Sequence, residues 1–290
     1  LGIKLPTSPA IRYLRAGLAW KRVLSWLKQE PVSVSNPFDR RAEAAGRLFR
    51  LTTEMGSMSA DKSLLLYYTL YGCLYSAAHP SPSGSISISL LGLFSVALGQ
   101  IDTGERLFGR AKKMAADNPE YLNEVLGQSS FAAIARGDLR HALELHQETI
   151  ELSSLQGDLW NRTTSQCFSA ELLLLQGAFQ NAASYARQAF NSPDTDETSK
   201  LTAARVLCLA GRGHEVSKRP EWSDTTRANR LVCLAQQALG LHELFVGNLA
   251  NAIEALRVAS EKFEQGVFFI GAPSASWLAT AYRVRGESRP

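Results

Sequence analysis

The chain has 290 residues, of which 45% are hydrophobic and 20% are charged. This composition excludes a chain that is disordered throughout, and its length suits one large domain or an elongated array of similar units. The net charge of +4 comes from an even mixture of signs and does not by itself indicate nucleic-acid binding.

The first predicted helix, over residues 8–29, contains a basic amphipathic segment. Ile11, Leu14, Leu18 and Leu27 fall near one face, and the basic residues fall mostly elsewhere. Such a helix could lie on a membrane surface or dock a partner. We favour an amphipathic helix that packs on the first hairpin with a solvated basic side, because arginine stems cover apolar surface well.

Apolar periodicity predicts an all-α chain with two parts. Residues 1–35 form the basic helix and a linker, and residues 36–290 form a helical repeat domain. The predicted helices span residues 8–29, 39–56, 59–78, 86–99, 102–116, 119–136, 139–155, 159–176, 179–191, 196–211, 224–246, 249–265 and 273–285. Clusters of Pro, Ser, Gly and Asp predict loops at residues 79–85, 191–197 and 217–224.

The region between Lys62 and Asp102 contains no charged residue. A membrane hairpin is one interpretation of its two apolar runs, 63–78 and 85–99. Both runs are shorter than the roughly 20 apolar residues of a spanning helix. We therefore expect two buried helices, and membrane contact is not favoured.

A short frame recurs along the chain. In Gly137-Asp138-Leu139-Arg140-His141-Ala142, a glycine is followed two residues later by an apolar residue and five residues later by a small one. The frame recurs at Gly99, Gly177 and Gly247, with weaker copies at Gly56, Gly213 and Gly286. The spacing is typical of helix-turn-helix repeats of roughly 34 to 47 residues. It predicts an α-solenoid of about six antiparallel helix hairpins.

Physical chemistry explains why a glycine stands in this frame. A helix commonly ends in the left-handed region, which glycine enters without the steric cost of a Cβ atom. Asp138 or Asn248 can cap the helix that follows. The small residue lets the two helices approach closely, and each hairpin needs a stacked neighbour to bury its face.

These residues resemble the tetratricopeptide repeat family. Its Leu-Gly pair is matched by Leu91-Gly92 and Leu239-Gly240, each seven residues before a turn glycine. The large and small residues downstream are matched by Phe108 with Ala111 and by Leu256 with Ala259. The copy at Gly137 departs from the pattern, with His146 and Thr149 at these places. The resemblance implies a right-handed superhelix.

The order of features is also similar to the helical-repeat region of large multidomain signalling ATPases, linked to nucleotide cyclases or kinases, and of MalT-like transcription activators. This likeness implies a non-catalytic regulatory or scaffold module that binds a protein, a peptide or a neighbouring domain of the same chain. The alternative is a segment of a multidomain ATPase, cyclase or kinase whose catalytic domains lie elsewhere. Because the last copy ends just after Gly286, we expect the sequence to be a piece of a longer chain.

In such arrays the first helix of each hairpin lines a concave groove, and polar side chains on it bind the partner. The residues that the frame places there are Asn123, Gln128, Arg162, Gln166, Arg205, Arg230 and Gln237. Each of them is also compatible with an ordinary solvated polar residue.

No catalytic, cofactor or metal motif is recognised. The four cysteines are far apart in apolar helical patterns, which predicts buried thiols in a reducing, cytoplasmic setting. His141 and His146 are five residues apart, which does not fit a zinc-binding helix and predicts one exposed and one partly buried histidine. The tripeptide Arg136-Gly137-Asp138 occupies a repeat turn, so we interpret its likeness to an adhesion motif as accidental.

Overall fold

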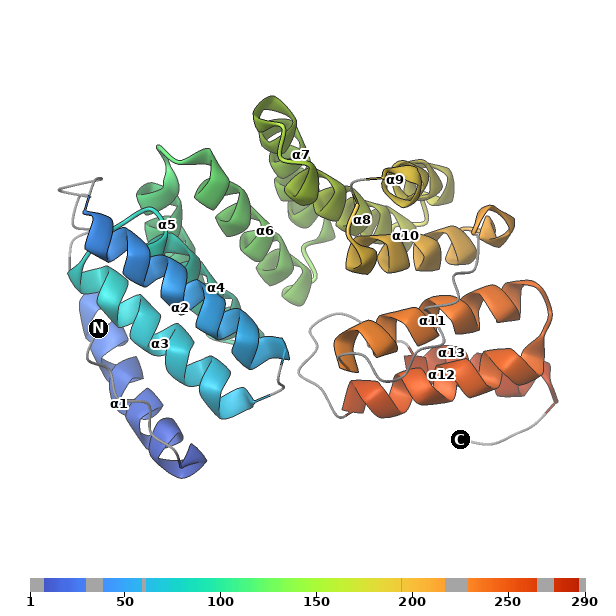
Figure 1. Ribbon diagram of the computed structural model, residues 1–290, viewed down its shortest axis with the longest axis horizontal. Coiled ribbons are helices and arrows are strands. Elements are labelled where there is room, and N and C mark those ends of the chain that lie inside the picture. The colour runs from blue at the N-terminus through green and yellow to red at the C-terminus, as the bar shows by residue number, and fades with distance from the viewer. Residues whose placement is uncertain are drawn as a thin grey trace. The chain divides into compact units, whose positions relative to one another are not determined.

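The computed structural model describes residues 8–29, 39–58, 61–193, 195–216, 229–264 and 274–286. In these ranges the chain forms thirteen α-helices and one short 3-10 helix, with no strand (Figure 1). The all-α class is therefore confirmed. Each predicted helix has an observed counterpart, and the predicted loop at 217–224 lies outside the described residues.

The helices belong to two compact units, Leu1–Gly157 and Asp158–Pro290. The first unit holds α1 (Pro9–Leu27), α2 (Arg40–Met58), α3 (Lys62–Ala78), α4 (Gly84–Ala97), α5 (Ile101–Ala115), α6 (Pro119–Ala135) and α7 (Leu139–Gln156). The second unit holds α8 (Leu159–Leu175), α9 (Phe179–Asn191), α10 (Glu197–Leu209), η1 (Gly213–Glu215), α11 (Asn229–Phe245), α12 (Leu249–Glu264) and α13 (Ser274–Val284).

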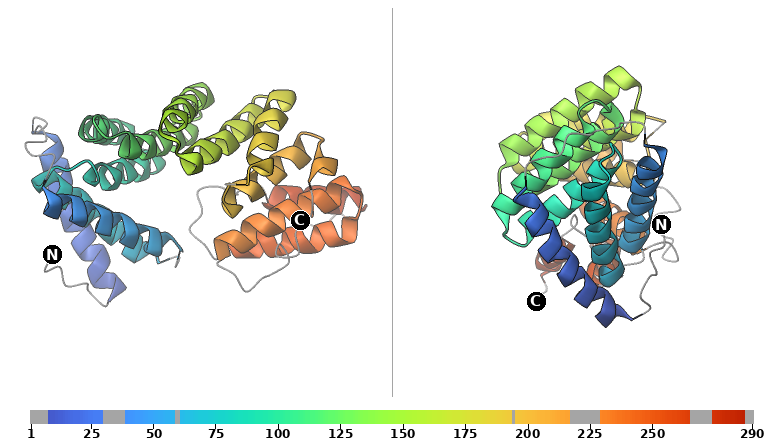
Figure 2. Two further views of the ribbon diagram at one scale, coloured as in Figure 1. Left: turned by 45° about the horizontal axis from the view of Figure 1, so that its top comes forward. Right: turned by 90° about the vertical axis from the view of Figure 1, so that its left-hand side faces the viewer.

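Helix α1 lies along one side of the first unit and packs on α3 (Figure 2). The sequence analysis set residues 1–35 apart from the repeats, whereas α1 shares a hydrophobic core with α3, α4 and α5. Its buried positions are Ala16, Ala19, Val23 and Leu27. Of the four apolar residues predicted to share a face, only Leu27 is buried, and Ile11, Leu14 and Leu18 are exposed. Small side chains, rather than the largest apolar ones, therefore make the close contact.

Four helix pairs form hairpins around the predicted turn glycines: α4–α5, α6–α7, α8–α9 and α11–α12. Gly99, Gly137, Gly177 and Gly247 have φ values of 79°, 80°, 77° and 83°. In each turn the next amide donates to the carbonyl five residues before the glycine's successor, as Asp138 N does to Ala133 O at 2.9 Å. This pattern satisfies carbonyls that the helix end would otherwise leave unpaired.

Acidic and amide side chains cap several helix starts. Asp138 accepts a hydrogen bond from the amide of His141, which begins α7. Asn118 and Asp158 cap α6 and α8 in the same way. These caps satisfy free amides in the first turn and fix where each helix begins.

The small residue of the frame lies at the closest approach of the two helices. Ala142, Ala182 and Ala252 are fully buried. In the α4–α5 hairpin the position is Gly104, where a Cβ atom would lie 2.4 Å from Val96 Cγ2 and 2.9 Å from the carbonyl oxygen of Gly92. Backbone contact at this distance leaves no room for a larger residue.

Two of the three weaker copies of the frame are wrong. Gly56 lies inside α2, and Gly213 lies in η1. The turn after α10 is made by Gly211, with φ 75°, because this helix ends two residues earlier than the frame assumed. Gly286 does have a positive φ of 81°.

The uncharged region forms α3, the following turn and α4. The α4 residues are almost all buried within the first unit, as expected for packed helices. Among the described helices, none combines the length and the hydrophobicity needed to cross a bilayer.

Candidate functional site

Two predicted groove residues lie on α6 and are used inside the helical packing. Asn123 is 1% exposed, and its Nδ2 donates to Ser153 Oγ on α7 at 3.1 Å. Gln128 accepts from Ser89 Oγ on α4 at 2.6 Å. Both amides join neighbouring helices, and Asn123 is too enclosed to line an open groove.

The other predicted groove residues lie in the second unit and do not converge on one surface. Arg162 and Gln166 on α8 are half-buried, and Gln166 Nε2 donates to Gln188 Oε1 on α9 at 3.3 Å. Gln237 on α11 is 0% exposed, so it also faces the interior. The side chain of Arg230 lies outside the described part of the chain.

Arg205 on α10 joins three elements of the second unit. Its Nη2 contacts Glu171 Oε1 on α8 at 2.7 Å, and its guanidinium carbon lies 5.7 Å from the centre of the Trp277 ring on α13. Burial raises the pKa of Glu171, and the charge of Arg205 acts in the opposite direction. Removing one partner of such an enclosed pair leaves an uncompensated charge, so the pair holds the packing of α8 against α10.

A cluster of titratable groups joins α2 to α6. Glu43 accepts hydrogen bonds from Tyr121 Oη, from Arg47 Nε and from the amide of Ser83. Burial opposes ionisation of Glu43, but these hydrogen bonds prevail and lower its pKa. Burial and the bond to Glu43 raise the pKa of Tyr121 to about 12. Neither group exchanges its proton near neutral pH, as a general acid or base would need to.

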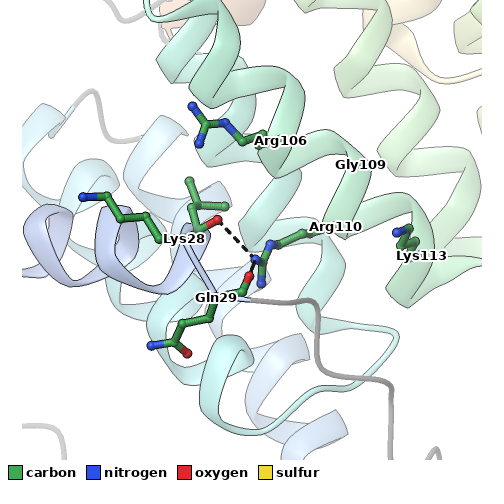
Figure 3. Close-up of a pocket in the computed structure, with 7 residues that line it drawn as sticks. Lys28, Gln29, Arg106, Gly109, Arg110 and Lys113 are labelled. Carbon is green, nitrogen blue, oxygen red and sulfur yellow. Dashed lines mark hydrogen bonds between the residues drawn. The ribbon is translucent and has the colours of Figure 1, made fainter.

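A basic pocket lies between the end of α1 and one side of α5 (Figure 3). Its volume is about 370 Å³, and its lining consists of Leu27, Lys28, Gln29, Arg106, Gly109, Arg110 and Lys113. Four of these seven residues are cationic and none is acidic. The sequence analysis noted the basic residues of α1 but not those of α5, which become neighbours of α1 only through folding.

Arg110 is the fixed element of this pocket. Its Nη2 donates to the carbonyl oxygens of Leu27 and Gln29, and its guanidinium lies 4.3 Å from the centre of the Trp26 ring. Cations are favoured at a helix C-terminus, where carbonyl groups are free. Arg110 therefore caps α1, while Lys28, Arg106 and Lys113 are exposed around it.

Exposed apolar side chains recur at the hairpin turns. Leu98 and Ile101 flank the first turn, Leu175 and Phe179 flank the third, and Val246 precedes Gly247. Leu98, Leu175 and Val246 expose 77%, 67% and 54% of their surface. The sequence signal for this surface, large apolar residues beside a solvent-facing glycine turn, was present but was assigned to the repeat frame alone.

The remaining sequence features have structural roles. Arg136 is not incidental, because it forms an ion pair with Glu105 on α5, and Asp138 caps α7. His141 is exposed, whereas His146 is fully buried rather than partly buried. Among the described residues no group of three or more His, Cys, Asp or Glu could hold a metal ion. The four cysteines are free and buried, and burial raises the pKa of Cys73 to about 12.

No protein-family model matches the sequence. A search of curated proteins finds no match either.

Proposed function

We propose that the chain is a helical-repeat interaction module, of the tetratricopeptide-like kind, that binds a protein partner or a neighbouring domain and performs no catalytic step itself. The recurrence of the same turn geometry at four predicted glycines supports the repeat part of this proposal. A regulatory role within a larger signalling protein, and a right-handed superhelix of about six hairpins, belong to the same proposal.

The observation that carries the binding role is the set of exposed apolar side chains at the turns. Apolar side chains gathered on a protein surface mark places where another molecule binds. Leu175 and Phe179, which lie on either side of Gly177, are 67% and 53% exposed. The polar residues on the first helices are a weaker basis, since Asn123 and Gln237 are enclosed.

A site-specific cross-linking experiment tests this role. A photo-reactive amino acid at Phe179, in the full 290-residue chain, should trap a discrete partner in an extract of the source cells. The same group at Leu155, an 86% exposed residue at the end of α7 away from the turns, is the matched control. The double substitution Leu175→Ser and Phe179→Ser should abolish co-purification of the trapped partner.

Thermal unfolding of each variant shows whether the fold is retained. Identical products from Phe179 and Leu155, or no product from either position, would contradict the proposal.

A further inference from the structure

The outward side of α1 carries an apolar stripe that the fold does not cover. Ile11, Leu14 and Leu18 are 47%, 67% and 56% exposed, while Ala16, Ala19 and Val23 face the core. At 3.6 residues per turn the three exposed residues lie within an arc of about 60°. The stripe therefore forms one narrow line along the exposed side of a helix at the edge of its unit.

Cations flank this stripe on both sides. Residues 8–29 contain five basic residues and no acidic one. Arg12 pairs with Asp61 at 2.8 Å, and Arg15 bonds to Tyr67. No ion pair of Lys21, Arg22 or Lys28 is found in the described part of the chain. Helical geometry places Arg22 on one side of the stripe and Lys21 and Lys28 on the other.

The basic pocket adjoins this surface. Lys28 belongs both to the exposed side of α1 and to the pocket lining, where Arg106, Arg110 and Lys113 contribute further cations (Figure 3). Arg110 is fixed by the carbonyl groups of α1 and by Trp26, so its charge cannot move away. The concave space of about 370 Å³ is large enough for a phosphate-bearing headgroup.

We infer that the outward face of α1, defined by Ile11, Leu14, Leu18, Lys21, Arg22 and Lys28, binds the surface of an anionic lipid bilayer. The three apolar side chains enter the boundary between headgroups and acyl chains, and the cations meet the lipid phosphates. A straight helix at the edge of a unit can lie along a planar surface. A protein partner would need a groove matched to a narrow stripe and carboxylates on both sides of it, so the bilayer is the simpler complement.

Vesicle co-sedimentation with the full 290-residue chain tests this inference. The chain should sediment with vesicles of phosphatidylcholine and phosphatidylglycerol, and stay in solution with vesicles of phosphatidylcholine alone. Raising the salt concentration to about 1 M shortens the Debye length to roughly 3 Å and should release most of the bound chain.

Two double variants separate the apolar and the ionic contributions. Leu14→Ser with Leu18→Ser, and Lys21→Glu with Arg22→Glu, should each lower partitioning to anionic vesicles by about tenfold or more, since one basic residue near such a surface contributes about fivefold. Leu155→Ser and Arg140→Glu on α7 are matched controls, because these side chains are also highly exposed. The controls should bind as the unaltered chain does.

Several outcomes would overturn the inference. One is equal binding to neutral and anionic vesicles. Another is full binding by either double variant whose thermal unfolding is unchanged. Absence of sedimentation with anionic vesicles would exclude the bilayer and leave an acidic protein as the occupant of this face. None of these results bears on the apolar turn residues, so the two proposals stand or fall separately.

Discussion

At the scale of single residues, the departure of one repeat from the family pattern is a matched pair. In the α4–α5 hairpin, a Cβ atom on Gly92 would lie 3.2 Å from Phe108 Cζ, and in α11–α12 one on Gly240 would lie 2.6 Å from Leu256 Cγ. The equivalent positions in α6–α7 are Ser130 and His146. Ser130 Oγ and His146 Nε2 are 2.8 Å apart and buried. A small residue opposite a large apolar one has thus been replaced by two hydrogen-bonding side chains.

This pair predicts a pH-dependent stability. Burial lowers the pKa of His146 to about 4 from an ordinary value near 6.5. Between these pH values the unfolded chain binds the proton and the folded chain does not, so the free energy of unfolding falls as the pH is lowered through this window. One group contributes a slope of up to about 1.4 kcal/mol per pH unit. Urea unfolding at a series of pH values between about 7 and 5 measures it.

The matched variant restores the family pattern at both positions. Ser130→Gly with His146→Phe should remove most of this slope above pH 5, where few carboxyl groups titrate. His141→Phe is the control, because His141 is exposed and its loss should leave the slope unchanged. An unchanged slope in the double variant would show that His146 is not the group responsible.

At the scale of elements, the helices were predictable because each carries its own signals. Apolar periodicity located all thirteen, and residues such as Asp138 and Gly137 fixed their ends. The sequence did not reveal which side of α1 is buried. Hydrophobicity favoured Ile11, Leu14 and Leu18, but close packing on α3 selected Ala16 and Ala19, and this choice depends on a surface far away in the chain.

The turn between α6 and α7 gives a prediction at this scale. Gly137 has φ 80° and open space around its missing Cβ, so conformation rather than crowding restricts the position. Gly137→Ala should lower the free energy of unfolding by about 1–2 kcal/mol, the cost of the left-handed region for a residue with a Cβ. Gly127→Ala, inside α6 and equally uncrowded, should raise it by roughly 0.5–1 kcal/mol. Chemical denaturation compares the two, and destabilisation by both would point to an unseen contact instead.

At the scale of the whole chain, the division into two units and the functional surfaces were the least predictable. Gly157 ends α7 with φ 70°, yet its sequence context lacks the apolar and small residues of the frame. The groove residues were chosen by register alone, and register does not distinguish a residue that faces solvent from one that faces the next helix. The pocket of α1 and α5 joins residues about 80 positions apart, as the bond of Arg110 to Leu27 shows.

The two units predict separable responses to damage of the core. In an array each repeat contacts its neighbours in sequence, so stability is close to a sum of local contributions. Leu126 in the first unit and Leu207 in the second are almost completely buried, and replacement of either by Ala should cost about 2–5 kcal/mol. Amide hydrogen exchange should show lowered protection across α4–α7 for Leu126→Ala and across α8–α12 for Leu207→Ala. Equal loss of protection along the whole chain in both variants would mean that the 290 residues unfold as one cooperative block.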